Sequence, residues 1–177
     1  MPNSDITRIE AISAAKLGIE IYQSNLSQFV AQNLDSLLPE WSAKTARTVL
    51  ILQQSQFPLD QQNAGVKQEK DRLRHQFLSL SLSMVEALNH QGFCSDVFDP
   101  QTGDPVFSRR GSLTHDDVAV VKALLNFPTT DDCCSGLIHP LWQTAVYPGV
   151  LITAATPTVT APLFKQILLH NNWVMQP

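Results

Sequence analysis

Residues 48–53, Thr-Val-Leu-Ile-Leu-Gln, are a dense run of β-branched residues and leucine. β-Branched side chains fit the pleated surface of a sheet, and a short continuous apolar run is typical of a strand with little exposure. The run therefore predicts a largely buried strand in the interior of the fold.

The longest predicted helix follows, from about residue 64 to residue 90. Its apolar side chains keep one stripe at helical spacing, formed by Val66, Leu73, Phe77, Leu80, Met84 and Leu88. Its solvent-exposed face is predicted from Lys67, Glu69, Lys70, Asp71, Arg72 and Arg74. Gly92 stands where a glycine commonly ends a helix.

Shorter elements are predicted on both sides of this helix. The strands cover residues 18–22, 93–98, 106–108, 133–139 and 146–155, and the helices cover 26–38, 115–126 with Thr114 as N-cap, and a segment that begins at Pro162. We expect 93–98 to pair with 106–108 through a turn, and 133–139 to pair antiparallel with 146–155. Two hairpin-like pairs between helices favour an α+β class: one domain with a mostly antiparallel sheet flanked by helices.

Composition excludes several classes of protein. The chain has 177 residues, 44% of them hydrophobic and 16% charged, which is typical of a globular domain and not of a disordered chain. Its formal net charge is −4, and Arg109-Arg110 is its one basic doublet. A nucleic-acid partner is therefore not expected, since such proteins usually carry a basic stripe.

The thiols and the apolar runs point to the cytoplasm. Residues 1–16 hold acidic and basic residues among isolated apolar ones, so we expect no signal peptide. The longest apolar run, residues 145–155, is shorter than the roughly 20 residues that a membrane span needs. Three cysteines do not make a secreted disulfide framework, so a cytoplasmic protein with free thiols is expected, without a membrane partner.

The common motifs for metals and nucleotides are absent from the sequence. There is no C-x-x-C, and the five histidines are scattered, so a zinc site built by this chain alone is not expected. The glycine-rich fingerprints of dinucleotide, P-loop and α/β-hydrolase proteins are also missing. His115-Asp116-Asp117 is interpreted as the solvated start of a helix.

Two of the three cysteines are adjacent, at Cys133 and Cys134. Successive side chains of a strand point to opposite faces, so the pair would not grip one metal together. Asp131 and Asp132 precede them, and nearby negative charge raises the pKa of a thiol, which disfavours a nucleophilic cysteine. Metal ligation remains open, because a bound metal displaces the thiol proton itself.

Other interpretations of these residues stay open at this point. Cys94, and either member of the cysteine pair, could simply fill the core. His139 lies six residues after Cys133, roughly 20 Å of extended chain, which is too far for a dyad within one strand. A flavin-dependent reductase would need a phosphate contact, for which Arg109-Arg110-Gly111-Ser112 is the candidate. A strained Cys133–Cys134 disulfide would instead make a redox sensor.

Several segments in a shared order resemble the methylmalonic aciduria and homocystinuria type D family of cobalamin-trafficking proteins. The similarity extends from Leu34 to about residue 169, and its pieces are Leu34–Glu40, the Glu69/Leu73/Phe77 helix, Gly92-Phe93, Asp96, Asp99-Pro100 with Gly103, Cys133-Cys134, His139, Leu141-Trp142, Thr144 and Thr153–Pro157. Residues 1–25 differ and are taken as a variable segment before a type D-like domain at 26–177, so mitochondrial targeting is not carried over.

The resemblance implies a nitroreductase-like α+β fold that has lost its flavin and works as an adaptor, not as an enzyme. It implies that Cys133 coordinates the cobalt of cobalamin held by a partner, the type C protein. A soft thiolate is a suitable cobalt ligand, and one sulfur is sufficient. Cys134, His139, Trp142 and Thr144 are implied to support this site. The oligomeric state is not predicted.

Overall fold

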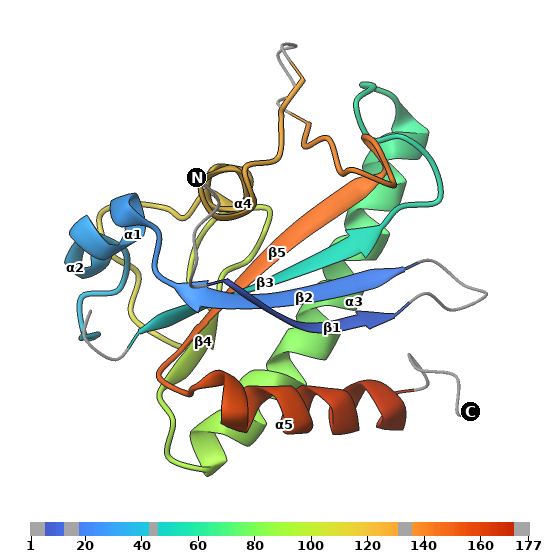
Figure 1. Cartoon of the computed structure of the whole chain (residues 1–177). Helices are drawn as coiled ribbons and strands as arrows, with labels where there is room; N and C mark the ends of the chain where they lie inside the picture. The colour runs from blue at the N-terminus through green and yellow to red at the C-terminus, as the bar shows by residue number, and fades with distance from the viewer. Residues whose placement is uncertain (1–5, 13–17, 43–45, 131–135, 172–177) are drawn as a thin grey trace.

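Strand β3, Arg47–Gln54, lies in the centre of an antiparallel sheet in the computed structural model of the chain (Figure 1). The structure describes residues 6–12, 18–42, 46–130 and 136–171. Within them the sheet has five strands in the order β1 (Thr7–Ile12), β2 (Ile19–Asn25), β3, β5 (Val146–Thr153) and β4 (Ser95–Val97). The α+β class, the single domain and the antiparallel sheet are thus confirmed.

Successive side chains of β3 enter two different hydrophobic clusters. Val49 and Ile51 face the cluster formed with α3 (Ala64–His90) and α5 (Pro157–His170). Leu50 and Leu52 face the cluster formed with α4 (Asp117–Leu125) and the short helices α1 (Gln28–Gln32) and α2 (Leu34–Leu37). Because both faces of the sheet are covered by helices, the 48–53 run is buried as predicted (Figure 1).

Helix α3 has the bounds that the sequence predicts. Asn63 caps its first turn, since its side-chain oxygen accepts a hydrogen bond from Val66 N, and Gly92 follows its end with φ of +85°. Glu69 is the exception on the predicted wet face: it is buried and accepts hydrogen bonds from Arg72, Ser55 and Gln56. In the described residues, no helix combines the length and the apolar character needed to cross a membrane.

Three predicted elements differ because side chains compete for backbone hydrogen bonds. The 26–38 helix is two helices, interrupted where Asn33 donates both backbone and side-chain N–H groups to Phe29 O. Residues 106–108 form no strand, since all three of their backbone N–H groups donate to the buried carboxylate of Asp96. Of the expected pairing with 93–98, a bridge between Phe98 and Pro105 and the hydrogen bond from Val106 N to Val97 O are present. Helix α4 begins later than predicted, with Asp116 instead of Thr114 as its N-cap.

Two further expectations were wrong about position. Strand β5 pairs with β3 and β4, and not with residues 136–139, the described part of the expected partner. Residues 131–135 lie outside the described residues, and 136–139 form only isolated bridges to Thr129 and Gln143. The last helix begins at Pro157, so Pro162 lies inside it.

The N-terminal strands belong to the same sheet as the rest of the chain. Strand β2 pairs with β3 along its whole length, from Ile19 opposite Gln53 to Asn25 opposite Arg47. The sheet therefore extends across residue 25. The expected boundary between a variable segment at 1–25 and a type D-like domain at 26–177 remains a prediction about sequence similarity. The nitroreductase-like classification also remains a prediction.

Candidate functional site

Cys133 and Cys134 lie outside the described residues, but the chain on both sides of them is held together. Thr130 N donates to Gly136 O at 2.8 Å, and Gly136 N donates to Thr130 Oγ1 at 2.9 Å. Two residues farther out, Ile138 N donates to Pro128 O at 2.8 Å. These hydrogen bonds join the two stretches of chain that flank the five residues with both cysteines.

His139 organises the turn that follows this segment. Its backbone exchanges hydrogen bonds with Gln143, at 2.8 and 3.0 Å. Its ring Nδ1 accepts the backbone N–H groups of Leu141 and Trp142, both at 3.1 Å. Because Nδ1 is used twice as an acceptor, the ring proton is assigned to Nε2. The indole of Trp142 stacks on the imidazole with ring centroids 4.1 Å apart.

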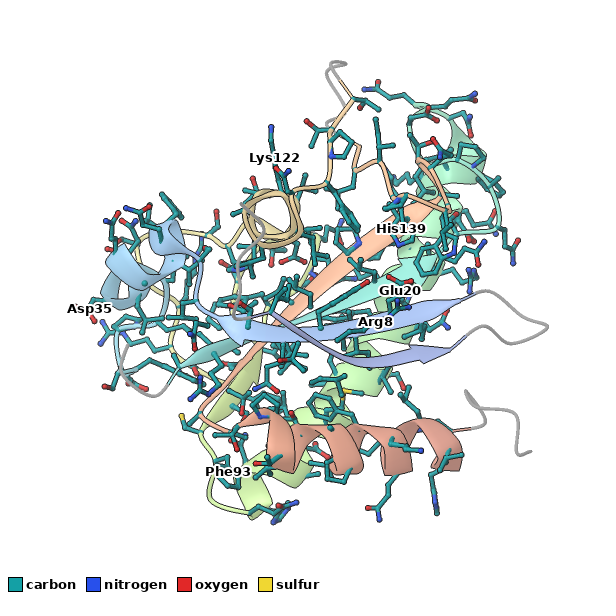
Figure 2. The ribbon with its side chains drawn as sticks, viewed as in Figure 1. Arg8, Glu20, Asp35, Phe93, Lys122 and His139 are labelled. Atoms are coloured by element: carbon teal, nitrogen blue, oxygen red, sulfur yellow. The ribbon has the colours of Figure 1, made fainter. Side chains whose placement is uncertain are left out.

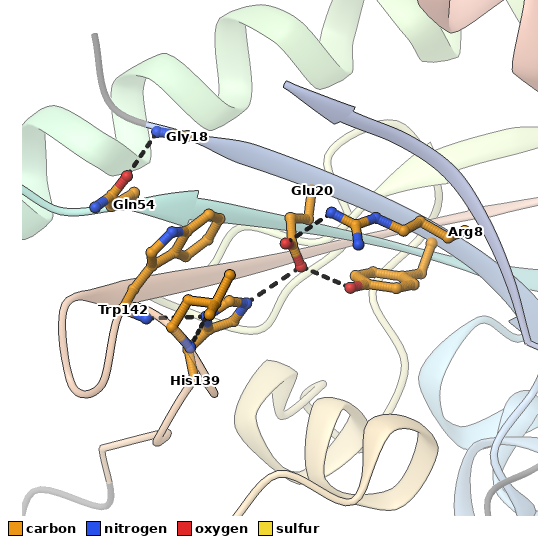
Figure 3. A network of polar contacts seen from close by, with 8 residues as sticks. Arg8, Gly18, Glu20, Gln54, His139 and Trp142 are labelled. Atoms are coloured by element: carbon orange, nitrogen blue, oxygen red, sulfur yellow. Dashed lines mark hydrogen bonds and ion pairs between the residues drawn. The ribbon is translucent and has the colours of Figure 1, made fainter. Parts of the chain in front are cut away.

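A buried carboxylate, Glu20 of β2, accepts a hydrogen bond from this ring N–H (Figure 3). Its Oε2 accepts hydrogen bonds from His139 Nε2 at 3.2 Å and from Tyr22 Oη at 2.6 Å, while its Oε1 pairs with Arg8 Nη2 at 2.8 Å. Figure 2 shows Arg8, Glu20 and His139 close together, with Arg8 and Glu20 on the two strands β1 and β2 at one edge of the sheet. These contacts attach the 139–143 turn to β1 and β2, 119 residues earlier in the chain.

The electrostatics of this group favour an ionised Glu20 beside a neutral phenol. Burial alone would raise the pKa of Glu20, but the hydrogen bonds from Tyr22 and His139 and the charges nearby outweigh it and hold the pKa below its ordinary value. Burial, together with the hydrogen bond to Glu20, raises the pKa of Tyr22 to about 12. The Tyr22 hydroxyl therefore remains a donor at neutral pH.

Sequence reasoning missed Arg8, Glu20 and Tyr22. One local signal was present: Glu20 is a charged residue inside the alternating strand 18–22, where it is 6% exposed. Its partner His139 is too distant in sequence for any local pattern to connect them. Of the predicted supporting residues, His139 and Trp142 are brought together by this network.

Thr144, the remaining supporting residue, lies at a different place, in the wall of a large cavity. Its carbonyl accepts the backbone N–H of Leu59 at 3.1 Å. The cavity measures about 880 Å³ and lies between the first half of α3, the 100–103 turn, the start of α4 and residues 136–148. Gly136 and Leu137, directly after the cysteine segment, also line it. The cavity is therefore adjacent in sequence and in space to the base of that segment.

Two other predicted features have structural explanations. His115 is buried, not solvated: its Nδ1 lies 2.8 Å from Asp117 Oδ1, and burial raises the pKa of that carboxyl in spite of the histidine. The candidate phosphate contact at 109–112 has Arg110 paired with Asp104 at 3.0 Å, and Gly111 packs against the backbone of α2. No group of three or more His, Cys, Asp or Glu residues in the described ranges could hold a metal ion.

Comparison with known proteins finds a family that matches most of the chain. The family model described as methylmalonic aciduria and homocystinuria type D protein matches residues 3–165. Similar curated proteins include the cobalamin trafficking protein CblD of Homo sapiens, 25% identical over 73% of this chain and 44% of the relative. Its counterpart in Gallus gallus is 21% identical over 79% of this chain and 47% of the relative. The chain thus spans less than half the length of the relatives it matches.

Proposed function

The chain belongs to the methylmalonic aciduria and homocystinuria type D protein family, and we propose that it acts in cobalamin trafficking. The observation that carries the proposal is the family match across residues 3–165, together with relatives named as cobalamin trafficking proteins. The match includes all five strands and the segment with both cysteines.

In the proposed mechanism Cys133 becomes an axial ligand of the cobalt in a cobalamin carried by a type C-like partner protein. The thiol loses its proton to solvent as the cobalt–sulfur bond forms, because the metal itself favours the thiolate. Because the neighbouring Asp131 and Asp132 disfavour a free thiolate, the thiol loses its proton only when it binds a metal. The chain acts as an adaptor that changes the cobalt environment without a reaction of its own.

The described neighbours of the segment support such a role. The Thr130–Gly136 hydrogen bonds join the two stretches of chain that flank it, and the Glu20–His139 contact fixes the turn after it. A segment fixed at both ends loses less conformational entropy when its side chain binds a ligand. In this proposal His139 and Trp142 position the segment, Thr144 lines the cavity beside its base, and Cys134 is the neighbour of Cys133 without contact to the cobalt. The cytoplasm remains the proposed location.

The absorption spectrum of reduced cobalamin tests this assignment. The protein, mixed with cob(II)alamin and a type C-like partner, should change the spectrum, and Cys133→Ser should abolish the change. Cys94→Ser is the matched control, because Cys94 is an exposed cysteine of the described chain that lies outside the 131–135 segment. If the Cys133→Ser variant changes the cobalamin spectrum as the unsubstituted protein does, the assignment is wrong. Loss of the spectral change only in Cys134→Ser would assign the cobalt ligand to the second cysteine.

A further inference from the structure

The 139–143 turn presents a leucine to solvent. Leu141, its central residue, is 77% exposed, more than any other large apolar side chain in the described ranges. A single exposed leucine is common on protein surfaces and carries no argument by itself. Leu141 differs from such a residue because its backbone is fixed by several contacts.

These contacts all involve the residues on either side of Leu141. His139 exchanges backbone hydrogen bonds with Gln143, and its ring accepts the N–H groups of Leu141 and Trp142. Gln143 has φ of +52°, which residues other than glycine adopt rarely. Strain of this kind persists only where surrounding contacts impose it, and it is frequent at functional sites. The turn therefore holds an exposed leucine in one position.

A second loop lies beside this turn, at the same end of the sheet. Ser55 N donates to Ala145 O at 2.9 Å, and Leu59 N donates to Thr144 O at 3.1 Å. Strands β3 and β5 are paired up to this point, so the loop after β3 and the turn before β5 leave the sheet together (Figure 1). Phe57, between the two hydrogen-bonded residues of its loop, is 39% exposed.

The exposed side chains of 55–58 and 139–143 carry no charge. We call them the Leu141 surface, and they are Gln56, Phe57, Pro58, Pro140, Leu141 and Gln143. None of them lines the large cavity. Of the charged residues close by, Asp60 is half-buried, and Arg8 is paired with the buried Glu20. The Leu141 surface is thus a neutral surface with two apolar side chains that extend into solvent.

This composition suits contact with a protein. The centre of a protein interface is poor in charged residues and rich in apolar and aromatic ones, and its rim is polar. The large cavity next to the Leu141 surface is lined by both lysines and aspartates, as a rim would be. An anionic lipid surface or a nucleic acid would require cations, which the Leu141 surface lacks. Pro58 and Pro140 stiffen the two loops, which reduces the entropy lost on binding.

The position of the surface indicates which protein. Leu141 is five residues from Gly136, so their Cα atoms are at most about 18 Å apart. A standard interface covers about 800 Å² of each partner, which is a patch roughly 30 Å across. A protein that brings cobalt to the chain just before Gly136 therefore has a footprint that reaches the Leu141 surface.

We propose that the Leu141 surface docks the cobalamin-carrying partner, and that Leu141 inserts into an apolar pocket of that protein. Phe57 extends the apolar contact, and the amides of Gln56 and Gln143 form hydrogen bonds with neutral polar groups of the partner. The cobalamin stays in the partner, and this chain supplies the docking contact. The proposal rests on the proposed function and deepens it, because it assigns the surface that recognises the partner.

Isothermal titration calorimetry of the full chain with a purified type C-like protein that carries cob(II)alamin tests this. Leu141→Asp should weaken binding at least about tenfold, as for the loss of a central apolar anchor. Leu141→Met keeps an apolar side chain of similar size and should bind within about threefold of the unsubstituted chain. Because Leu141 is exposed, both variants should fold, which circular dichroism checks.

Phe29→Asp is the matched control. Phe29 is 62% exposed and belongs to α1, which follows β2 at the opposite end of the sheet (Figure 1). This variant should bind the partner as the unsubstituted chain does. Binding that Leu141→Asp leaves unchanged, or that Phe29→Asp weakens equally, would overturn the proposal. So would a dimer of the chain alone, seen by analytical ultracentrifugation, that Leu141→Asp dissociates, because the surface would then serve a second copy.

The docking contact and the cobalt ligand can fail independently. At concentrations that saturate the weakened complex, Leu141→Asp should still change the cobalamin spectrum. An affinity that depends on Leu141, without a spectrum that depends on Cys133, would support this proposal while the cobalt assignment fails. A spectrum that depends on Cys133, with an affinity indifferent to Leu141, would do the reverse.

Discussion

At the scale of single residues, Glu20 is the point where distant parts of the chain meet. Its carboxylate is 6% exposed, and it accepts hydrogen bonds from Arg8, Tyr22 and His139. A buried charge is tolerated only when it is paired and hydrogen-bonded in this way. Since His139 also holds the turn after the cysteine segment, the position of that turn depends on Glu20.

Glu20→Gln keeps the size of the side chain but removes its charge, and its single carbonyl oxygen cannot serve all three donors. We expect the free energy of unfolding to fall by about 1–3 kcal/mol, as for a buried donor left unsatisfied. Urea unfolding of the variant measures this. Glu86→Gln, on the exposed face of α3, is the control and should stay within about 0.5 kcal/mol.

The effect of Glu20→Gln should also depend on pH. Because the folded-state pKa of Glu20 lies below its ordinary value of 4.5, the carboxylate contributes stability above that value. The contribution is lost as the pH falls through the lowered folded-state pKa. The difference in unfolding free energy between the two proteins should therefore shrink below pH 4.5. A difference that stays constant from neutral to acid pH would contradict this account.

At the scale of elements, local sequence patterns predicted the helix with a periodic apolar stripe. They missed the places where side chains take up backbone hydrogen bonds. Helix α3 follows from its apolar stripe and its capping residues. The loop at 106–108 could not be predicted, because all three of its N–H groups donate to Asp96 and only that of Val106 also reaches β4. In the site, the sequence connected His139 with Trp142, which is local. It could not connect His139 with Glu20, since these residues are 119 positions apart and meet only when the 139–143 turn packs against β2.

The contact between α3 and β5 depends on a residue without a side chain. A Cβ atom on Gly149 would lie 2.3 Å from the ring of Phe77, which is fully buried. Gly149→Ala should therefore lower the free energy of unfolding by about 1–3 kcal/mol through overpacking. Thermal unfolding measures the loss. Adding Phe77→Leu should recover part of it, and a double variant whose losses simply add would argue against a direct clash.

At the scale of the whole molecule, the sheet joins two clusters that lie on its opposite faces. Leu50 belongs to the cluster with α4, and Ile51, the next residue of β3, belongs to the cluster with α3 and α5. Because one strand contributes to both clusters, we expect the clusters to unfold together. This arrangement also makes the site a property of the complete fold, since its residues come from β1, β2, α3, α4 and the 136–148 region.

Leu50→Ala and Ile51→Ala form a matched pair on opposite faces of one strand. Each should cost about 2–5 kcal/mol, as for a large apolar side chain removed from a core. Each should shift a single unfolding transition, seen at the same urea concentration by tryptophan fluorescence and by circular dichroism. Two separate transitions in either variant would show that the clusters are independent.

The most direct test of the proposed function is the electron paramagnetic resonance of cob(II)alamin bound to the protein and a type C-like partner. An axial nitrogen ligand splits the cobalt signal further through its nuclear spin, whereas the common isotope of sulfur has none. The account predicts a signal without nitrogen splitting, with parameters that change in Cys133→Ser and stay the same in Cys94→Ser. A signal that is identical in the Cys133→Ser variant would contradict it.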